Sequence, residues 1–368
     1  MGWFGIFDRD AGFAGGAGGQ FQRPAAGDAA PSGTETALLA RGTLRLEFEA
    51  LPGGDVPARL LHYRDDAGWP RELVVYLNAD HSLSVAFRQG PAHAYARLSG
   101  IRATGGARLL ASCRWDGPAR RGTLSVEDPE VREIRLIEFA CPLPLPERDA
   151  RALLRPGAKT RLDPRVSGLA LSSRPEPVGP AATIAPQTPV ATPEGARPIE
   201  TLRPGDLVTT LDSGPQPVRW ILRQEVPLTG ADAPVRLNAP FFGLSRDIVV
   251  TARQGILLSG PGAQYHLGRD SVLVRAGELT GHAGATRLPA STPSAVRYQL
   301  LFDRHECISL ADTWADSLFV GTLARCPAVL AETALAPLGP GALPRHRRPV
   351  RTTLSGYEAL ILRDVLPA

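Results

Sequence analysis

Few residues of this sequence are spaced for metal binding or nucleophilic chemistry. Its four cysteines form no C-x-x-C pair and have no metal-ligand spacing; they are Cys113, Cys141, Cys307 and Cys326. Free buried thiols are the favoured interpretation, and two disulfides are the alternative. His305 and Glu306 are adjacent and would point to opposite faces of a strand, which argues against a two-ligand metal site. We therefore expect neither a metal nor a cofactor.

A second chemical feature is a polar step inside an apolar segment. Residues 250–258, VTARQGILL, have the pattern of a strand, a short polar break and a second strand. Arg253, Gln254 and Gly255 form the break. Their role depends on the elements that position them, which the rest of the chain defines.

The composition favours two domains built mostly of short strands. A chain of 368 residues exceeds the usual size of one domain. Aromatic residues make up only 6% of it, whereas 38 glycines and 35 prolines favour short strands and turns over long helices. The net charge of +4 is mild, and the arginines are scattered rather than clustered. This distribution argues against a surface that binds nucleic acid.

Residues 1–34 are rich in glycine and alanine, lack periodicity, and are predicted to be a flexible leader. They have no basic start, sustained apolar run or cleavage site, so we predict no ordinary signal peptide. No stretch of the sequence reaches the length of a membrane span. The compartment is left open between the cytoplasm and secretion by a signal-independent route.

Residues 35–148 have the alternation of an antiparallel β-sandwich. In TLRLEFEAL, residues 43–51, the apolar side chains lie on one face and the charged ones on the other. The stretches ELVVYLNADHSLSVAF and LLASCRWDGPARRGTLSVE each have the pattern of two strands joined by a turn. Short alternating strands without helices between them are typical of such sandwiches.

Residues 149–182 are predicted to be a Pro-rich linker, because the prolines of SSRPEPVGPAATIAPQTP cannot hold a sheet together. A short helix-compatible piece, ERDARALL, lies at the preceding boundary. Residues 183–368 then alternate strands and tight turns again. The tail RTTLSGYEALIL is predicted to be an amphipathic helix with Leu354, Tyr357, Leu360 and Ile361 on one side.

Five stretches of the second region occur in a characteristic order: TPVATPEGARPIETLRPGDLVTTLDSGPQPVRWI, RDIVVTARQGILL, YQLLFDRHE, DSLFVG and RTTLSGYEALIL. In sequence and order they resemble the Hint domain, shared by hedgehog C-terminal regions and inteins, in a bacterial subgroup. It implies a compact all-β Hint fold over residues 183–368 with a helical C-terminal tail. YLNADHSLSV and WDGPARRGTLSVE resemble, more weakly, the concanavalin-like sandwiches that precede this subgroup.

The resemblance implies a site whose chemistry has been exchanged. A Hint domain starts at a nucleophilic Cys that attacks the preceding carbonyl, and a Thr-x-x-His motif binds the amide and protonates its nitrogen. Here Thr183 stands at the nucleophile position, and TARQ places Gln254 where the histidine belongs, after Thr251. RYQLLFD puts Gln299 in place of a second histidine. Of the family's polar positions, Thr251, Asp303, His305 and Glu306 survive, and for the last three we expect hydrogen bonding at strand edges.

Three hypotheses for function follow. The first is a Hint protein that has lost autocatalytic processing and acts as a binding or scaffold module for an unknown protein or glycan partner. The alternative is an active protein that cuts itself before Thr183 and releases its N-terminal domain. The second alternative is carbohydrate binding by the sandwich, for which Trp115 and the turn from Asn78 to His81 are the candidate features. The favoured interpretation of Trp115 and Asp116 is a core aromatic and a turn carboxylate.

Overall fold

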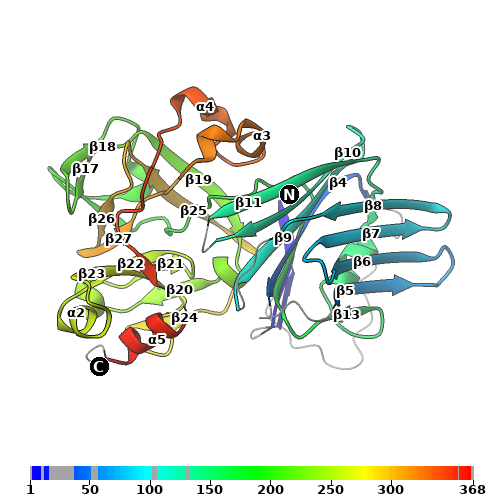
Figure 1. The fold of residues 1–368 in the computed structure, drawn as a ribbon, viewed down its shortest axis with the longest axis horizontal. Coiled ribbons are helices and arrows are strands. Elements are labelled where there is room, and N and C mark those ends of the chain that lie inside the picture. The colour runs from blue at the N-terminus through cyan, green and yellow to red at the C-terminus, as the bar shows by residue number, and fades with distance from the viewer. Residues whose placement is uncertain are drawn as a thin grey trace. The chain divides into compact units, whose positions relative to one another are not determined.

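The structure is a computed structural model that describes residues 2–9, 12–15, 37–50, 57–101, 106–129, 132–354 and 356–365. It divides into two compact units (Figure 1). The first comprises Met1–Gly179 with Ala290–Ser294, and the second Pro180–Pro289 with Ala295–Ala368. Both units are mostly β, which confirms the predicted fold class.

The first unit contains a seven-stranded and a five-stranded sheet, in which every described strand pair is antiparallel. In the order of the larger sheet, its strands are β11 (Glu133–Ala140), β10 (Arg121–Asp128), β9 (Arg108–Asp116), β4 (Arg41–Glu49), β14 (Val166–Ser172), β1 (Trp3–Asp8) and β2 (Gly12–Gly15). The smaller sheet runs through β13 (Thr160–Leu162), β5 (Ala58–Asp65), β6 (Arg71–Leu77), β7 (Leu83–Gln89) and β8 (Ala92–Leu98). A short pair joins β3 (Leu38–Leu39) to β12 (Leu145–Pro146), and α1 (Glu147–Leu153) follows.

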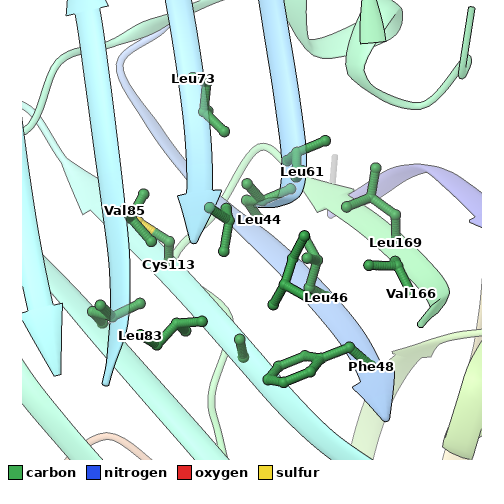
Figure 2. Packing of buried hydrophobic residues seen from close by; sticks show 14 of the residues in the cluster. Leu44, Leu46, Phe48, Leu61, Leu73, Leu83, Val85, Cys113, Val166 and Leu169 are labelled. Atoms are coloured by element: carbon green, nitrogen blue, oxygen red, sulfur yellow. The ribbon is translucent and has the colours of Figure 1, made fainter. Parts of the chain in front are cut away.

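Both sheets contribute to one hydrophobic core (Figure 2). Leu44 and Phe48 of β4 and Leu169 of β14 lie in it together with Leu73 of β6 and Val85 of β7. These side chains come from alternate positions of their strands, as the period of two in the sequence predicted. Burial of each large apolar side chain contributes roughly 1.5–3 kcal/mol, so this shared core is what holds the two sheets together.

Trp115 belongs to this core, as the sequence analysis favoured. Its side chain is only 1% exposed, and its ring NH donates to the carbonyl of Leu39 at 2.9 Å. Gly42 lies directly across from it on β4, where an added Cβ would approach the indole to 2.3 Å. Asp116 accepts from the amide of Ala119 in the following turn and pairs with Arg41. Both residues therefore have structural roles.

A buried ionic cluster connects α1 to the smaller sheet. Asp149 accepts hydrogen bonds of 2.7 Å from both Tyr63 OH and Arg71 Nε. Arg71 also donates to Asp65 at 2.8 Å, and Lys159 donates to the same Asp65 carboxylate at 2.9 Å. Each charge in the cluster thus faces an opposite one, which is the condition for burying charges at acceptable free energy.

The predicted division of the N-terminal half is wrong in two places. Residues 149–182 were expected to be a linker, but β13 pairs with β5, and β14 lies between β4 and β1 in the larger sheet. The expected leader, residues 1–34, contains β1 and β2; its remaining part lies outside the described residues. Both errors have the same cause, because these strands pair with segments far away in sequence. The sandwich therefore extends past residue 148, and the division between the units lies after Gly179.

The second unit contains three sheets. The largest has nine strands: β16 (Gly195–Pro198), β15 (Pro189–Thr192), β26 (Cys307–Leu310), β27 (Thr313–Asp316), β22 (Gly255–Ser259), β23 (Ser271–Arg275) and β28 (Thr353–Leu354) in order, with β17 (Leu207–Thr210) paired to β26 and to β18 (Gly214–Pro217). A second sheet pairs β19 (Trp220–Pro227) with β25 (Ser294–Leu301). The third orders β21 (Ile248–Thr251), β20 (Pro234–Leu237) and β24 (Ala285–Arg287). Their inner faces share a core that includes Ile184, Val250, Ile256, Leu300 and Ile308.

The helices of this unit are short. They are α2 (Pro261–Leu267), α3 (Pro327–Leu330), α4 (Gly339–Ala342) and α5 (Gly356–Asp364), with single 3₁₀ turns at Ile199–Thr201, Gly230–Asp232, Phe241–Gly243, Leu323–Arg325 and Ala336–Leu338. Among the described residues, no helix has the length and apolar character needed to cross a membrane.

The C-terminal helix forms as predicted, but its buried face was wrongly assigned. Leu354 precedes the helix in β28, and Tyr357 is 77% exposed. The buried residues of α5 are Ala359 and Leu362 instead. The predicted stripe counted Leu354 as a helical residue, and starting the helix after the strand rotates the face that meets the core.

Candidate functional site

A short backbone segment brings the predicted site residues together. Ile184 forms bridges to Val250 of β21 and to Tyr298 of β25, so the segment lies between these two strands. The amide of Thr183 donates to the carbonyl of Tyr298 at 3.2 Å, and the amide of Thr251 donates to the carbonyl of Thr183 at 2.8 Å. Positions separated by more than a hundred residues in the sequence therefore occupy one patch.

Three side chains from these segments form a closed hydrogen-bond network. The hydroxyl of Thr183 donates to Gln254 Oε1. Gln299 Nε2 donates to Thr183 Oγ1 at 2.9 Å and to Gln254 Oε1 at 3.1 Å. All three side chains are buried. The oxygen of Thr183 thus lies between two side-chain amides.

Asp316 completes this network, although no motif in the sequence predicted a role for this residue. Gln254 Nε2 donates to Asp316 Oδ1 at 2.6 Å and to its backbone carbonyl at 3.0 Å. The amide of Gly255 donates to the same carboxylate oxygen at 3.0 Å. An added Cβ at Gly255 would approach this oxygen to 2.8 Å, so the glycine of TARQG provides space for the carboxylate. The available signal was an aspartate at the end of a buried strand, in TWAD.

The other two polar residues of TARQ have separate environments. Thr251 is fully buried, and its Oγ1 has no hydrogen-bond partner in the described part of the chain. Arg253 forms an ion pair with the buried Asp232, with 2.8 Å between Nε and Oδ1. The polar break in VTARQGILL is thus explained by an ion pair at Arg253, an amide network at Gln254 and a close approach at Gly255.

Gln187, just before the strand that starts at Pro189, has an unusual backbone conformation. Its φ is +64°, in the left-handed region that favours glycine. Its amide donates to Glu200 at 2.7 Å. A glutamine therefore occupies a turn conformation that glycine usually adopts.

Asp303, His305 and Glu306 lie outside the network. Asp303 is exposed and pairs with Arg219 at 2.6 Å, so it has a surface ion pair rather than the expected strand-edge role. Glu306 accepts from Ser213 at 3.0 Å. His305 is buried; its Nε2 donates to the carbonyl of Ser317 at 3.1 Å. Its Nδ1 accepts from the amide of Val350, and 3.7 Å separate Nε2 from Asp316 Oδ2.

The cysteines do not replace the missing nucleophile. Cys307 lies on β26, and burial raises the pKa of its thiol to about 12. Burial likewise raises the pKa of Cys113 in the first unit to about 12. These two thiols stay protonated near neutral pH and are therefore weak nucleophiles. Cys141 and Cys326 are free and exposed, so the expectation of free buried thiols holds for two of the four.

The arrangement can hold the chain but provides little acid–base chemistry. Side-chain amides neither take up nor release a proton near neutral pH, so Gln254 and Gln299 can only donate and accept hydrogen bonds. A threonine hydroxyl also ionises far less readily than a thiol. Asp316 is the ionisable group that touches the network, and it meets Gln254 rather than the Thr183 hydroxyl.

Comparisons with known proteins bear on both units. The Hint domain family matches residues 182–322. Among solved structures, the gp41-1 intein is 11% identical with a TM-score of 0.23, and the alignment covers 37% of this chain and 98% of the intein. The CBM40 of Ruminococcus gnavus IT-sialidase bound to alpha2,3 sialyllactose is 12% identical with a TM-score of 0.22, and the alignment covers 36% of this chain and 62% of that structure.

No curated protein matches the sequence. The family match covers the segment that begins the site, the TARQ motif and the strand that carries Gln299. Residues 182–322 of this chain are a Hint domain.

Proposed function

We propose that this protein does not cleave itself and that its Hint domain serves as a scaffold or binding module. The observation that carries the proposal is the network around Thr183, whose hydroxyl donates to Gln254 Oε1 and accepts from Gln299 Nε2. Attack on the preceding carbonyl requires that the hydroxyl lose its proton to a base. An amide oxygen is not a base of useful strength, so the proton has no acceptor in this network.

The departure of the amide nitrogen is also unsupported. A positioned general acid typically contributes about 10²- to 10⁴-fold in rate, and Gln254 can donate a hydrogen bond but cannot deliver a proton. The loss of a thiol nucleophile at Thr183 slows the first step as well. The two losses act on successive stages of the same acyl shift, so both the forward attack and the bond cleavage are slow.

The bond before Thr183 is enclosed by apolar side chains. Ala182 is fully buried in a cluster with Leu222, Leu301, Leu335 and Leu343. The last two of these lie after residue 322, beyond the segment that matches the Hint family. The C-terminal extension thus helps to exclude water from the position where a Hint domain cleaves, which favours a structural role.

Hydroxylamine treatment tests this proposal. An acyl shift onto the Thr183 hydroxyl would create an ester, which hydroxylamine cleaves much faster than an amide. We expect the full chain to stay intact in hydroxylamine at neutral pH on a denaturing gel. Fragments that end at Ala182 and begin at Thr183 would contradict the proposal.

A gain-of-function variant complements this test. Thr183→Cys with Gln254→His restores a thiol and a general acid, and we expect thiol-induced cleavage before residue 183. Thr183→Cys with Gln254→Asn is the matched control, because it keeps the thiol but supplies no acid. Cleavage to the same extent in both variants would contradict the role assigned to position 254.

Carbohydrate binding by the sandwich is a second candidate, favoured by one group of residues. Tyr95 on β8 is 56% exposed, and its hydroxyl shares a hydrogen bond of 3.1 Å with Ser84. Asn78 Nδ2 donates to Ser84 Oγ at 2.8 Å. An exposed ring beside oriented polar groups suits a sugar, which stacks on aromatics and forms hydrogen bonds. Trp115 does not support this candidate, because it is buried.

A glycan array probed with the full chain tests this candidate. Tyr95→Ala removes the exposed ring and should abolish any specific signal. Tyr265→Ala is the control, since Tyr265 is also exposed but lies in the other unit. The same glycan signal from both variants would rule out the surface around Tyr95.

A further inference from the structure

Arg297 on β25 is a buried cation whose side chain is incompletely satisfied. The residue is 6% exposed, and Nη1 donates to the carbonyl of its neighbour Val296 at 3.0 Å. Its Nε has no hydrogen-bond partner within the described residues. Because arginine remains protonated in proteins, Arg297 cannot escape this situation by becoming neutral.

The nearest carboxylate already has a partner. Asp232 is fully buried and pairs with Arg253, with 2.8 Å between Nε and Oδ1. Burial lowers the pKa of the Arg297 guanidinium, and the charge of Asp232 only partly opposes this effect. The charge of Asp232 therefore acts on Arg297 without fully compensating its burial. A buried charge that is only partly compensated is destabilising, which favours a further counterion.

A second unsatisfied polar group lies on the same face as Arg297. Ile184 pairs with both Tyr298 and Val250, so these three residues point to one side of the patch. The residues one position away, including Arg297, Gln299 and Thr251, point to the other side. Thr251 Oγ1 is buried and has no partner in the part of the chain that the structure describes. Two buried hydrogen-bond donors thus lie on one face: Thr251 is level with Thr183, and Arg297 is two residues along β25 from Gln299.

We propose that this face of the Hint domain binds a carboxylate group, held by Arg297 with help from Thr251. The guanidinium edge formed by Nε and Nη2 offers two parallel N–H donors, because Nη1 is engaged with Val296. That fork matches the two oxygens of a carboxylate. The bound charge compensates Arg297, and the carboxylate offers an acceptor to the Thr251 hydroxyl, which has no partner within the described residues. This site does not depend on the absence of self-cleavage, and it defines a ligand class for the domain.

Saturation-transfer NMR on the full chain with sodium acetate tests the site. We expect transfer to the acetate methyl group in the natural chain, and none to the methyl group of acetamide, which has the same shape without the charge. Arg297→Gln should reduce the acetate signal at least tenfold. Arg297→Lys keeps the charge but loses the fork, and should reduce it several-fold. Absence of acetate binding in the natural chain would overturn the proposal.

Three further variants make the test specific. Arg223→Gln is the matched control, because Arg223 is exposed on β19, the strand that pairs with β25. It should leave the signal unchanged, and an equal loss in Arg223→Gln and Arg297→Gln would overturn the assignment. Thr251→Val should weaken binding about tenfold, the effect of a lost hydrogen bond to a charged group. Arg297→Met, which keeps much of the side-chain volume, replaces Arg297→Gln if circular dichroism shows that the latter is unfolded.

The source of the carboxylate is resolved with a peptide. An N-acetylated tripeptide with a free C-terminus is compared with the same tripeptide as its amide. Tighter binding of the acid than of acetate would identify a chain terminus as the source, and equal binding would identify a small free acid. Both results support a carboxylate site, whereas equal binding of the acid and the amide contradicts it.

Discussion

One polar cluster in each unit buries its side chains in a different way. In the sandwich, Asp149 and Asp65 are matched by Arg71 and Lys159, so ionic groups face each other at hydrogen-bond distance. In the Hint domain, the Thr183 hydroxyl meets two neutral amides, Asp316 contacts one of them, and unsatisfied donors lie on the same face. A satisfied ionic cluster is explained by the fold alone. The amides and the orphaned donors fit our proposal of a site that keeps its framework and has changed its chemistry.

The ionic cluster gives the largest expected effect on stability. Asp149→Ala removes the buried acceptor of Tyr63 OH and Arg71 Nε and leaves Arg71 with Asp65 alone, and should destabilise the sandwich by about 3–5 kcal/mol. Asp66→Ala is the control, because it removes an exposed partner of Arg64 and should leave the stability of the sandwich nearly unchanged. Hydrogen exchange read by mass spectrometry on β6 measures both. Similar losses in the two variants would contradict the difference between buried and exposed pairs.

The amide network around Thr183 should contribute less to stability than the ionic cluster of the sandwich. Gln254→Ala removes the shared partner of Thr183 and Asp316, and should destabilise the Hint domain by about 1–3 kcal/mol. Gln264→Ala on α2 is the control, because that glutamine is exposed. Hydrogen exchange in β21 and β22 reports the change. A loss as large as that of Asp149→Ala would mean that the amide network is as tightly coupled as the ionic one.

The dependence of stability on pH should also differ between the two units. Burial alone would raise the pKa of Asp65. Its hydrogen bonds from Lys159 and from the Ala67 amide, together with the charge of Arg71, outweigh burial, so the pKa of Asp65 is lowered. A carboxyl group whose pKa is lower in the folded than in the unfolded state stabilises the fold at pH values above its unfolded pKa of about 3.9. This contribution is lost as the pH falls through the folded-state pKa. The sandwich should lose stability below about pH 4. Asp65→Asn should flatten this dependence in urea unfolding measured from pH 6 to 3, and an unchanged slope would contradict the linkage.

The smallest effect concerns the cysteines, which divide evenly between the units. Each unit contains one buried thiol, Cys113 or Cys307, and one exposed thiol, Cys141 or Cys326. Burial raises the pKa of both buried thiols to about 12, so a thiol reagent should label two cysteines in the folded chain and four in denaturant. Peptide mapping identifies them. Rapid labelling of Cys307 in the folded chain would show that the Hint domain opens more readily than the sandwich.

Local patterns predicted much of the fold. The alternation in β4 and the turns that join β6 to β7 and β9 to β10 are visible in short stretches of sequence. The placement of β1 and β14 is not visible in short stretches of sequence, because each of them pairs with a strand more than a hundred residues away. The buried face of α5 was misassigned because the register of the helix depends on β28, which ends just before it.

The site was predicted only in part. The resemblance implied that Thr183, Thr251, Gln254 and Gln299 would meet, because aligned motifs carry information about a shared fold. Asp316 was missed because its contact with Gln254 arises from the pairing of β22 with β27, which no motif encodes. Arg297 was missed for another reason, since a buried arginine in a strand looks like an exposed one until its surroundings are known.

The intact mass of the purified natural chain tests the central claim most directly. After prolonged incubation at neutral pH, with and without added thiol, mass spectrometry should find a single species at the full 39.1 kDa. Fragments that correspond to residues 1–182 and 183–368 would show that the Thr183 network still supports cleavage, and would contradict the account of a Hint domain retained for its scaffold.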